Sequence, residues 1–138
     1  MLGALIMRSM MRKNQARTVE TKDLEALKKM WADDVTLTFM GQPPIVGKPA
    51  VEAWYRLWFE AMKEIHEHPK HFSLARPYTL GFTNTVLWEA TGEHLFKDGR
   101  TTVVKTAVAI DFERGKAKAI RLYVADPAGE KTYLGATA

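Results

Sequence analysis

The chain has 138 residues and no cysteine, and 46% of its residues are hydrophobic. This length suits one domain, predicted to span residues 1–138, with enough apolar content for a packed core. The absence of cysteine excludes disulfide scaffolds, thiolate metal centres and cysteine nucleophiles, and it fits a cytoplasmic protein. Twenty basic and 16 acidic residues leave a formal charge of only +4, so the composition predicts no nucleic-acid partner.

The N-terminal segment begins with a short apolar run, Met1–Met7, and continues into the basic residues Arg8, Arg12, Lys13 and Arg17. The apolar run is far shorter than the roughly 20 residues that span a bilayer, so no membrane partner is expected. No aromatic residues interleave with the basic ones, as stacking on single strands would require. The segment is interpreted as an amphipathic helix with a solvated basic face.

The first half of the chain is predicted to be helical, with one early strand. Thr21 is placed as the cap of a helix that runs to about Trp31, and residues 35–40 alternate as a strand does. A third helix begins near Pro49. Its apolar residues step by three and four, which favours a core-facing stripe over a cofactor site, and no cofactor is predicted. The stripe consists of Val51, Trp54, Tyr55, Trp58, Phe59, Met62 and Ile65.

The second half of the chain is predicted to form strands joined by tight turns. Pro77 suggests an edge strand or a bulge, and Gly92 suggests a bend. The turns are Lys97–Arg100 and Glu113–Lys116, and the strands cover residues 72–80, 85–96, 101–112 and 117–125. The expected fold class is therefore α+β: a cone-shaped, strongly curved, mixed or antiparallel sheet wrapped around three N-terminal helices. Such a cone can hold a small molecule in its mouth.

Two segments carry a resemblance to a known superfamily. They are WADDVTLTFMGQPPIVGKPAVE at residues 31–52 and GKAKAIRLY at residues 115–123. Their order and spacing resemble the nuclear transport factor 2-like superfamily, in its branch of SnoaL-like cyclases and limonene epoxide hydrolases. The resemblance covers most of the chain from about Thr21, and it implies a cone fold, a small hydrophobic ligand and a homodimer. It does not fix the chemistry, since the superfamily supports several reactions.

The catalytic sets of the named relatives are not kept in this sequence. The resemblance places Thr91, Glu89 and Leu122 where limonene epoxide hydrolases have Asp, Arg and Asp. It places Leu37 and Phe39 where those enzymes have Tyr and Asn. The ketosteroid isomerase set is missing as well. A different catalytic group is therefore expected.

The same alignment predicts which side chains line the cavity. Glu89 becomes the candidate general acid or base, because a carboxylate in an apolar cavity suits proton transfer, and Thr91 would help to orient water or substrate. The substrate-binding residues implied by the resemblance and the helix pattern are Leu37, Phe39, Trp54, Trp58, Val104, Thr106, Val108, Ile120, Leu122 and His94.

His94 belongs to this set only under an alternative register. A shift of one residue in the strand at residues 85–96 would turn Glu89 outward and bring Trp88, Ala90 and His94 inward. His94 would then be the candidate base.

No metal site is predicted. The three histidines His66, His68 and His71 lie close together, but they are interpreted as the end of the third helix and the following loop. Asp126 follows the last strand one residue later than in the family pattern.

The sequence thus supports three hypotheses. The first is a cofactor-independent SnoaL-like enzyme, of isomerase, cyclase, dehydratase or epoxide-hydrolase type, that acts on a small hydrophobic substrate. The second is a non-catalytic module that binds a ligand in the same cavity. The third is a homodimeric interaction protein that uses the outer face of the sheet, where Val103, Lys105, Ala107, Ala109 and Asp111 are expected.

Overall fold

The computed structural model describes residue 9 and residues 16–76 and 83–125. Its order of elements is α2 (Leu24–Lys29), β1 (Trp31–Phe39), β2 (Ile45–Val46), α3 (Lys48–Ala61), β3 (Met62–Leu74), β4 (Asn84–Phe96), β5 (Thr101–Glu113) and β6 (Lys116–Val124). Residues 16–20, which precede α2, are also helical. Arg8, Arg12, Lys13, Pro77 and Asp126 lie outside the described residues.

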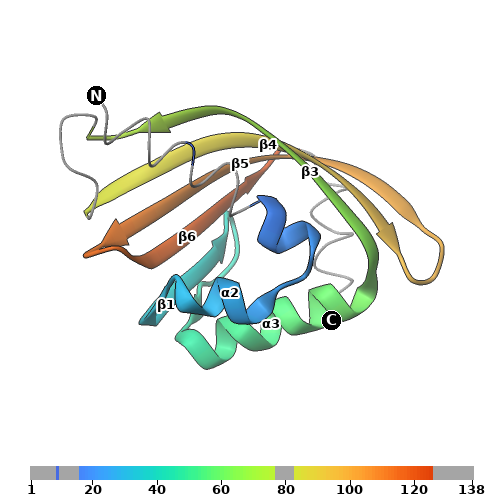
Figure 1. The fold of residues 1–138 in the computed structure, drawn as a ribbon, viewed down its shortest axis with the longest axis horizontal. Helices are drawn as coiled ribbons and strands as arrows, with labels where there is room; N and C mark the ends of the chain where they lie inside the picture. Colours follow the sequence, from blue (N-terminus) through green and yellow to red (C-terminus); the bar gives the residue numbers. More distant parts are fainter. Residues whose placement is uncertain (1–8, 10–15, 77–82, 126–138) are drawn as a thin grey trace.

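The strands form one six-stranded sheet in the order β2-β1-β6-β5-β4-β3. β1 and β6 pair in parallel, and every other neighbouring pair is antiparallel. Figure 1 shows the sheet curving over α2 and α3, which lie on its concave side. The predicted α+β fold class, with a curved sheet wrapped around the N-terminal helices, is therefore confirmed.

The helices differ from the prediction at their ends. α2 begins after Asp23, whose carboxylate accepts a hydrogen bond from the Ala26 backbone N–H at 3.1 Å. The predicted cap Thr21 instead donates its hydroxyl to the Arg17 carbonyl at 2.7 Å, at the end of the preceding helical segment. Helix α3 has Pro49 in its first turn as predicted. It buries Tyr55 and Trp58 against the sheet.

The largest error in the predicted elements concerns residues 62–74. The apolar spacing of Met62 and Ile65 extends the predicted helix, but the chain leaves α3 at Ala61 and enters β3. Met62 pairs with Phe96, and the pairing with β4 continues to Leu74. Tertiary pairing therefore overrides a local helical pattern, as is common for short stretches of ambiguous sequence.

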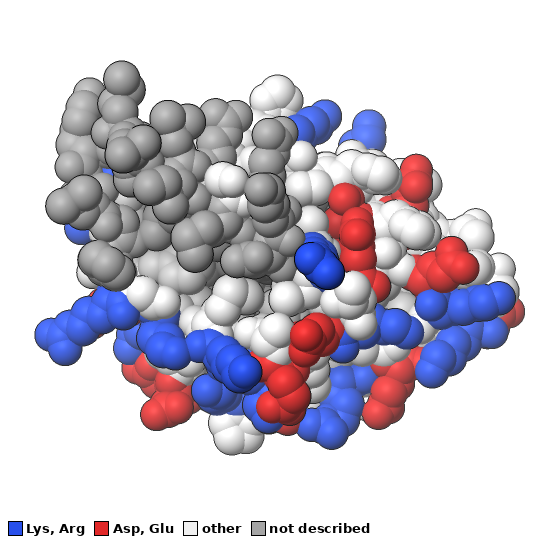
Figure 2. Space-filling view, in the orientation of Figure 1, with Lys and Arg blue, Asp and Glu red and all other residues white. Residues whose placement is uncertain are grey.

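The core fills the space between the helices and the concave face of the sheet. Leu37, Val51, Met62 and Val104 are completely buried there. Most charged residues lie on the outside, and Figure 2 shows acidic and basic side chains interspersed over the described part of the visible face. None of the described helices is long and apolar enough to cross a membrane.

Candidate active site

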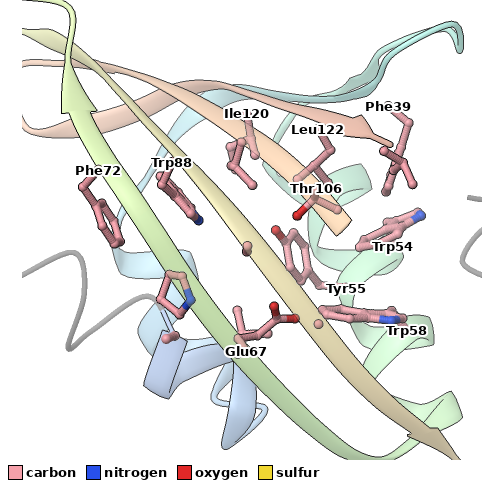
Figure 3. Close-up of a pocket in the computed structure, with 17 residues that line it drawn as sticks. Phe39, Trp54, Tyr55, Trp58, Glu67, Phe72, Trp88, Thr106, Ile120 and Leu122 are labelled. Carbon is pink, nitrogen blue, oxygen red and sulfur yellow. The ribbon is translucent and has the colours of Figure 1, made fainter. Parts of the chain in front are cut away.

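A cavity lies between α3 and the concave face of the sheet. Its volume is about 100 Å³, somewhat less than the roughly 150 Å³ apolar cavity that can hold a benzene ring in a protein core. Figure 3 shows side chains from α3 on one side and from the long strands on the other. The described lining residues are Ala16, Val19, Phe39, Trp54, Tyr55, Trp58, Glu67, Pro69, Phe72, Trp88, Ala90, Gly92, Thr106, Val108, Ile120, Leu122 and Val124.

Aromatic rings form two walls of the cavity. On the helix side, Trp54 and Trp58 lie one turn apart on α3 and stack with ring centroids 5.7 Å apart. On the strand side, Phe72 and Trp88 stack with centroids 5.6 Å apart and an interplanar angle of 19°. Phe39 packs against Trp54 with ring centroids 5.0 Å apart. The walls suit an apolar ligand, because burying such rings and ligand surface together removes both from water.

Three polar side chains interrupt this apolar lining: Glu67 of β3, Tyr55 of α3 and Thr106 of β5. Figure 3 shows all three directed into the cavity. Glu67 is the only acidic side chain among the described lining residues, and no lysine or arginine is among them. The cavity is therefore an apolar site with one carboxylate and two hydroxyl groups.

The carboxylate of Glu67 is held by a buried histidine. Its Oε1 lies 2.9 Å from His94 Nε2, and the His94 side chain is 0% exposed while that of Glu67 is 18% exposed. The His94 ring also meets Trp58 edge-on, with centroids 5.6 Å apart. His94 does not line the cavity, so it lies behind the carboxylate. This arrangement orients Glu67 and leaves the second carboxylate oxygen for a ligand.

The backbone at Glu67 is fixed from the opposite side. β3 is an edge strand, and the Glu67 backbone N–H donates a hydrogen bond to Glu20 Oε1 at 2.9 Å. Five residues earlier on the same strand, the Met62 carbonyl accepts a hydrogen bond from Lys22 Nζ at 2.8 Å. The segment before α2 is thereby fastened to the strand that carries Glu67.

Tyr55 is a hydrogen-bond donor at physiological pH. Burial raises the pKa of its phenol well above the ordinary value, and the nearby Glu67 carboxylate raises that pKa further. The hydroxyl therefore keeps its proton. No described residue forms a hydrogen bond with the Tyr55 or Thr106 hydroxyl, so both groups are open to a ligand in the cavity.

Most of the predicted substrate-binding residues lie at this cavity. Leu37 and Val104 are instead fully buried in the adjoining core, and His94 lies behind Glu67. The predicted residues that line the cavity are Phe39, Trp54, Trp58, Thr106, Val108, Ile120 and Leu122.

The predicted orientation of β4 is wrong by one residue. Trp88, Ala90 and His94 are buried on the concave face, whereas Glu89 is exposed on the convex face and Thr91 points the same way as Glu89. Glu89 pairs in register with Lys70 and Ala107, away from the cavity. The alternative register is thus the one that the structure has. The larger apolar surface of Trp88 decides it, because that surface is buried only in this register.

Sequence reasoning misses Glu67 and Tyr55 as polar groups of the site. The helical pattern places Tyr55 in the core-facing stripe, and it places the residues around Glu67 at the end of that helix. A signal for Glu67 does exist, since Ile65, Glu67 and Pro69 alternate with His66 and His68 in the inward–outward pattern of a strand.

The histidines around Glu67 do not gather into a metal centre. His66 and His68 lie on the outward face of β3, 3.4 Å from Glu64 and 3.5 Å from Glu93 respectively. Within the described ranges, no three histidine, aspartate or glutamate side chains come together in a set that could hold a metal ion. The predicted position of these histidines at a helix end is wrong, because residues 62–74 form β3.

Comparison with known proteins identifies the family. The model of the SnoaL-like domain matches residues 13–120, and the comparison with curated proteins gave no match. A proposed aromatic ring hydroxylase from Novosphingobium aromaticivorans is 22% identical over 90% of each chain, with a TM-score of 0.75. A proposed SnoaL-like polyketide cyclase from Jannaschia sp. CCS1 is 9% identical over 94% of this chain and 90% of its own, with a TM-score of 0.71.

A hexachlorocyclohexane dehydrochlorinase, LinA-type3 from Novosphingobium barchaimii, is 13% identical over 91% of this chain and 90% of its own, with a TM-score of 0.72. Identities this low establish a shared fold and leave the reaction open. The family model and the fold agree with the nuclear transport factor 2-like resemblance of residues 31–52 and 115–123. The chain belongs to the SnoaL-like domain family.

Proposed function

We propose that this protein is a cofactor-independent enzyme that moves a proton on a small, uncharged, largely hydrophobic substrate, with Glu67 as the general base. The observation that carries the proposal is a single carboxylate in an aromatic cavity, oriented from behind by a buried histidine at 2.9 Å. A positioned carboxylate is a common acid–base catalyst, and such groups typically contribute about 10²–10⁴ in rate.

Glu67 is the group that would touch the substrate, and His94 would act through it. Glu67 lines the cavity, whereas the His94 side chain is fully buried and has its Nε2 directed at the carboxylate. His94 is therefore proposed as a positioning residue. It holds one oxygen of Glu67 and leaves the other to accept the proton.

The two hydroxyl groups suggest where negative charge would collect. If Glu67 removes a proton from a carbon next to a carbonyl, the C–H electron pair moves to form a C=C bond and the carbonyl oxygen becomes negative. Tyr55, which keeps its proton, and Thr106 are proposed to donate hydrogen bonds to that oxygen. Return of the proton from Glu67 to another carbon gives isomerisation. Transfer of that proton to a hydroxyl group on the β-carbon, which leaves as water while the C=C bond forms, gives dehydration.

The charge of the lining favours a neutral substrate. An anion placed in the cavity would meet the Glu67 carboxylate without a lysine or arginine among the described lining residues. Removing an anion from water without a partner is costly. We therefore expect small neutral ketones and enones to bind and their carboxylated analogues to be excluded.

Proton exchange tests the proposal with simple compounds in place of the natural substrate. Small cyclic ketones and enones are incubated with the protein in D₂O, and exchange at the α-carbon is followed by NMR. We expect catalysed exchange with the wild type and a loss of at least about 100-fold with Glu67→Gln. Glu89→Gln is the matched control, since it removes a carboxylate on the convex face, and it should keep the wild-type rate. Undiminished exchange with Glu67→Gln would refute the assignment.

A binding module is the second candidate, favoured by the predominantly apolar lining of the cavity. Trp54, Trp58 and Trp88 make ligand binding visible as a change in tryptophan fluorescence. Saturable binding of the neutral ketones, without α-carbon exchange of any bound compound, would select this candidate over the enzyme.

For either function we propose a homodimeric, cytoplasmic protein. The convex face of the sheet exposes apolar side chains at Leu87, Val103 and Tyr123, and Ala107 lies exposed among them. Apolar residues gathered on one sheet face are typical of a subunit interface. The cysteine-free composition supports the cytoplasmic location.

A further inference from the structure

Gly92 lies directly beside the pair formed by Glu67 and His94. It is the β4 residue that pairs in register with Glu67, and it precedes His94 by two residues on the same concave face. It is buried and lines the cavity. From the sequence alone, a glycine at this position suggests a bend in the strand.

Backbone conformation does not explain this glycine. The described glycines with positive φ are Gly41, Gly47, Gly99 and Gly115, and Gly92 is not among them. A glycine inside a strand at an ordinary φ weakens the strand, because it loses more backbone freedom on folding and packs no side chain. Another factor must therefore favour glycine at this position.

The space around Gly92 is already occupied by the pair. A Cβ atom added at Gly92 would lie 2.6 Å from His94 Nε2, 2.9 Å from His94 Cε1 and 3.2 Å from Glu67 Oε1. The first two separations are well inside the usual contact distance of about 3.5–4.0 Å between carbon atoms. The Cβ would meet the same two atoms that face each other in the hydrogen bond, Nε2 and Oε1. Alanine, the smallest residue with a side chain, would therefore have to displace the imidazole.

We infer that Gly92 is a positioning residue of the proposed reaction: the lack of a side chain at this position permits His94 to hold Glu67 in its cavity-facing orientation. The inference rests on the proposed function for its catalytic meaning. Its structural part, that position 92 controls the geometry of the pair, can be tested separately.

The first measurement follows the imidazole resonances of His94 by NMR in the wild type and in Gly92→Ala. We expect Gly92→Ala to shift these resonances and to lower the rate of α-carbon exchange at least tenfold. The loss should fall mainly on kcat rather than KM, because the substitution acts on the Glu67–His94 pair and removes no aromatic side chain from the cavity walls. Unshifted His94 resonances in Gly92→Ala would overturn the inference.

The second measurement repeats the substitution in a His94→Ala background, where the imidazole no longer occupies the space. If position 92 acts through the imidazole, Gly92→Ala should lower the denaturant midpoint in the wild type and change it little, or raise it, in this background. A Gly92→Ala variant that folds only in the His94→Ala background would support the inference equally. An equal loss in both backgrounds would point to the strand itself and overturn it.

The two proposals fail in different ways. Exchange that survives Glu67→Gln refutes the proposed function, whereas the His94 resonances and the denaturant midpoints still decide the role of Gly92. Conversely, unshifted resonances with exchange lost in Glu67→Gln would leave the assignment of Glu67 standing and remove Gly92 from the site.

Discussion

The two faces of β4 show how one strand can place similar groups in opposite environments. Glu89 and His94 are both ionisable and five residues apart, but Glu89 is exposed on the convex face and His94 is buried on the concave face. The buried group has a carboxylate partner at 2.9 Å. The position of a polar residue relative to the sheet, more than its type, therefore decides whether it can serve a site, because a buried ionisable group needs a partner and an exposed one is solvated.

The largest effect that tests this difference between the two faces of β4 is expected from removing one apolar side chain on each face, Trp88 on the concave face and Leu87 on the convex face. Trp88→Ala deletes a buried side chain that stacks on Phe72, and we expect the free energy of unfolding to fall by about 3–5 kcal/mol. Leu87→Ala, on the convex face where Leu87 is 40% exposed in the single chain, should cost about 1 kcal/mol or less in the monomeric protein. Denaturant titration at protein concentrations low enough to keep the chain monomeric measures both losses. Equal losses under these conditions would contradict the comparison of the two faces.

A charge on the convex face tests directly whether that face is a subunit interface. Ala107 is exposed on β5 between Glu89 and Tyr123, its partners in register on the neighbouring strands. We expect Ala107→Arg to convert a dimer into a monomer without unfolding it, because the arginine would have to be desolvated in the contact. Light scattering after size exclusion provides the measurement, and Ala53→Arg on the exposed face of α3 is the control. A wild type that is monomeric at every concentration would remove the homodimer from the proposal.

The smallest effect on stability is expected from removing an ion pair on the convex face. Asp111 of β5 accepts hydrogen bonds from Arg121 Nη2 at 3.0 Å and from the Thr85 hydroxyl at 2.6 Å. The Arg121 hydrogen bonds, followed by that of Thr85, hold the pKa of the Asp111 carboxyl below its ordinary value.

Because the folded-state pKa is the lower one, this stabilisation is complete above the unfolded-state pKa of about 3.9 and is lost as the pH falls through the folded-state pKa. We expect the denaturant midpoint of Asp111→Asn to fall less than that of the wild type when the pH is lowered from about 6 to about 3. Asp33→Asn, at an exposed position of β1, is the control and should retain the wild-type pH dependence. An identical pH dependence in Asp111→Asn would show that the pair contributes no measurable stability.

The sequence predicts the fold well because its strongest patterns agree with the tertiary structure. The part of the helical stripe from Val51 to Phe59, the strands over most of residues 85–125 and their turns all depend on local spacing or turn residues, and these features are present in the structure. The residues that β5 and β6 contribute to the cavity lining can also be predicted from the sequence. They are Thr106, Val108, Ile120 and Leu122, which alternate with polar or small neighbours. A clear period of two leaves only one face that can be buried.

The polar part of the site could not be predicted because its patterns are ambiguous. In β4, Val86 and Leu87 are adjacent, as are Leu95 and Phe96, so either face offers apolar residues to the core. Only the packing of Trp88 against Phe72, a residue far away in the sequence, resolves the register. Glu67 lies in β3, which forms by pairing with β4 against a helical pattern, and such non-local pairing is invisible to local spacing.

The position of Glu67 on an edge strand has a consequence for self-association of the protein. An exposed strand edge can recruit a strand from another chain, and this is a route to aggregation. Along the outer edge of β3, the N–H of Glu67 is already bonded to Glu20, and Pro69, two residues further on, has no N–H to offer. The Met62 carbonyl is bonded to Lys22. The contacts that hold the backbone of the proposed catalytic carboxylate thereby also occupy groups that a foreign strand would need for pairing, so the same hydrogen bonds serve both the site and the protection of this edge.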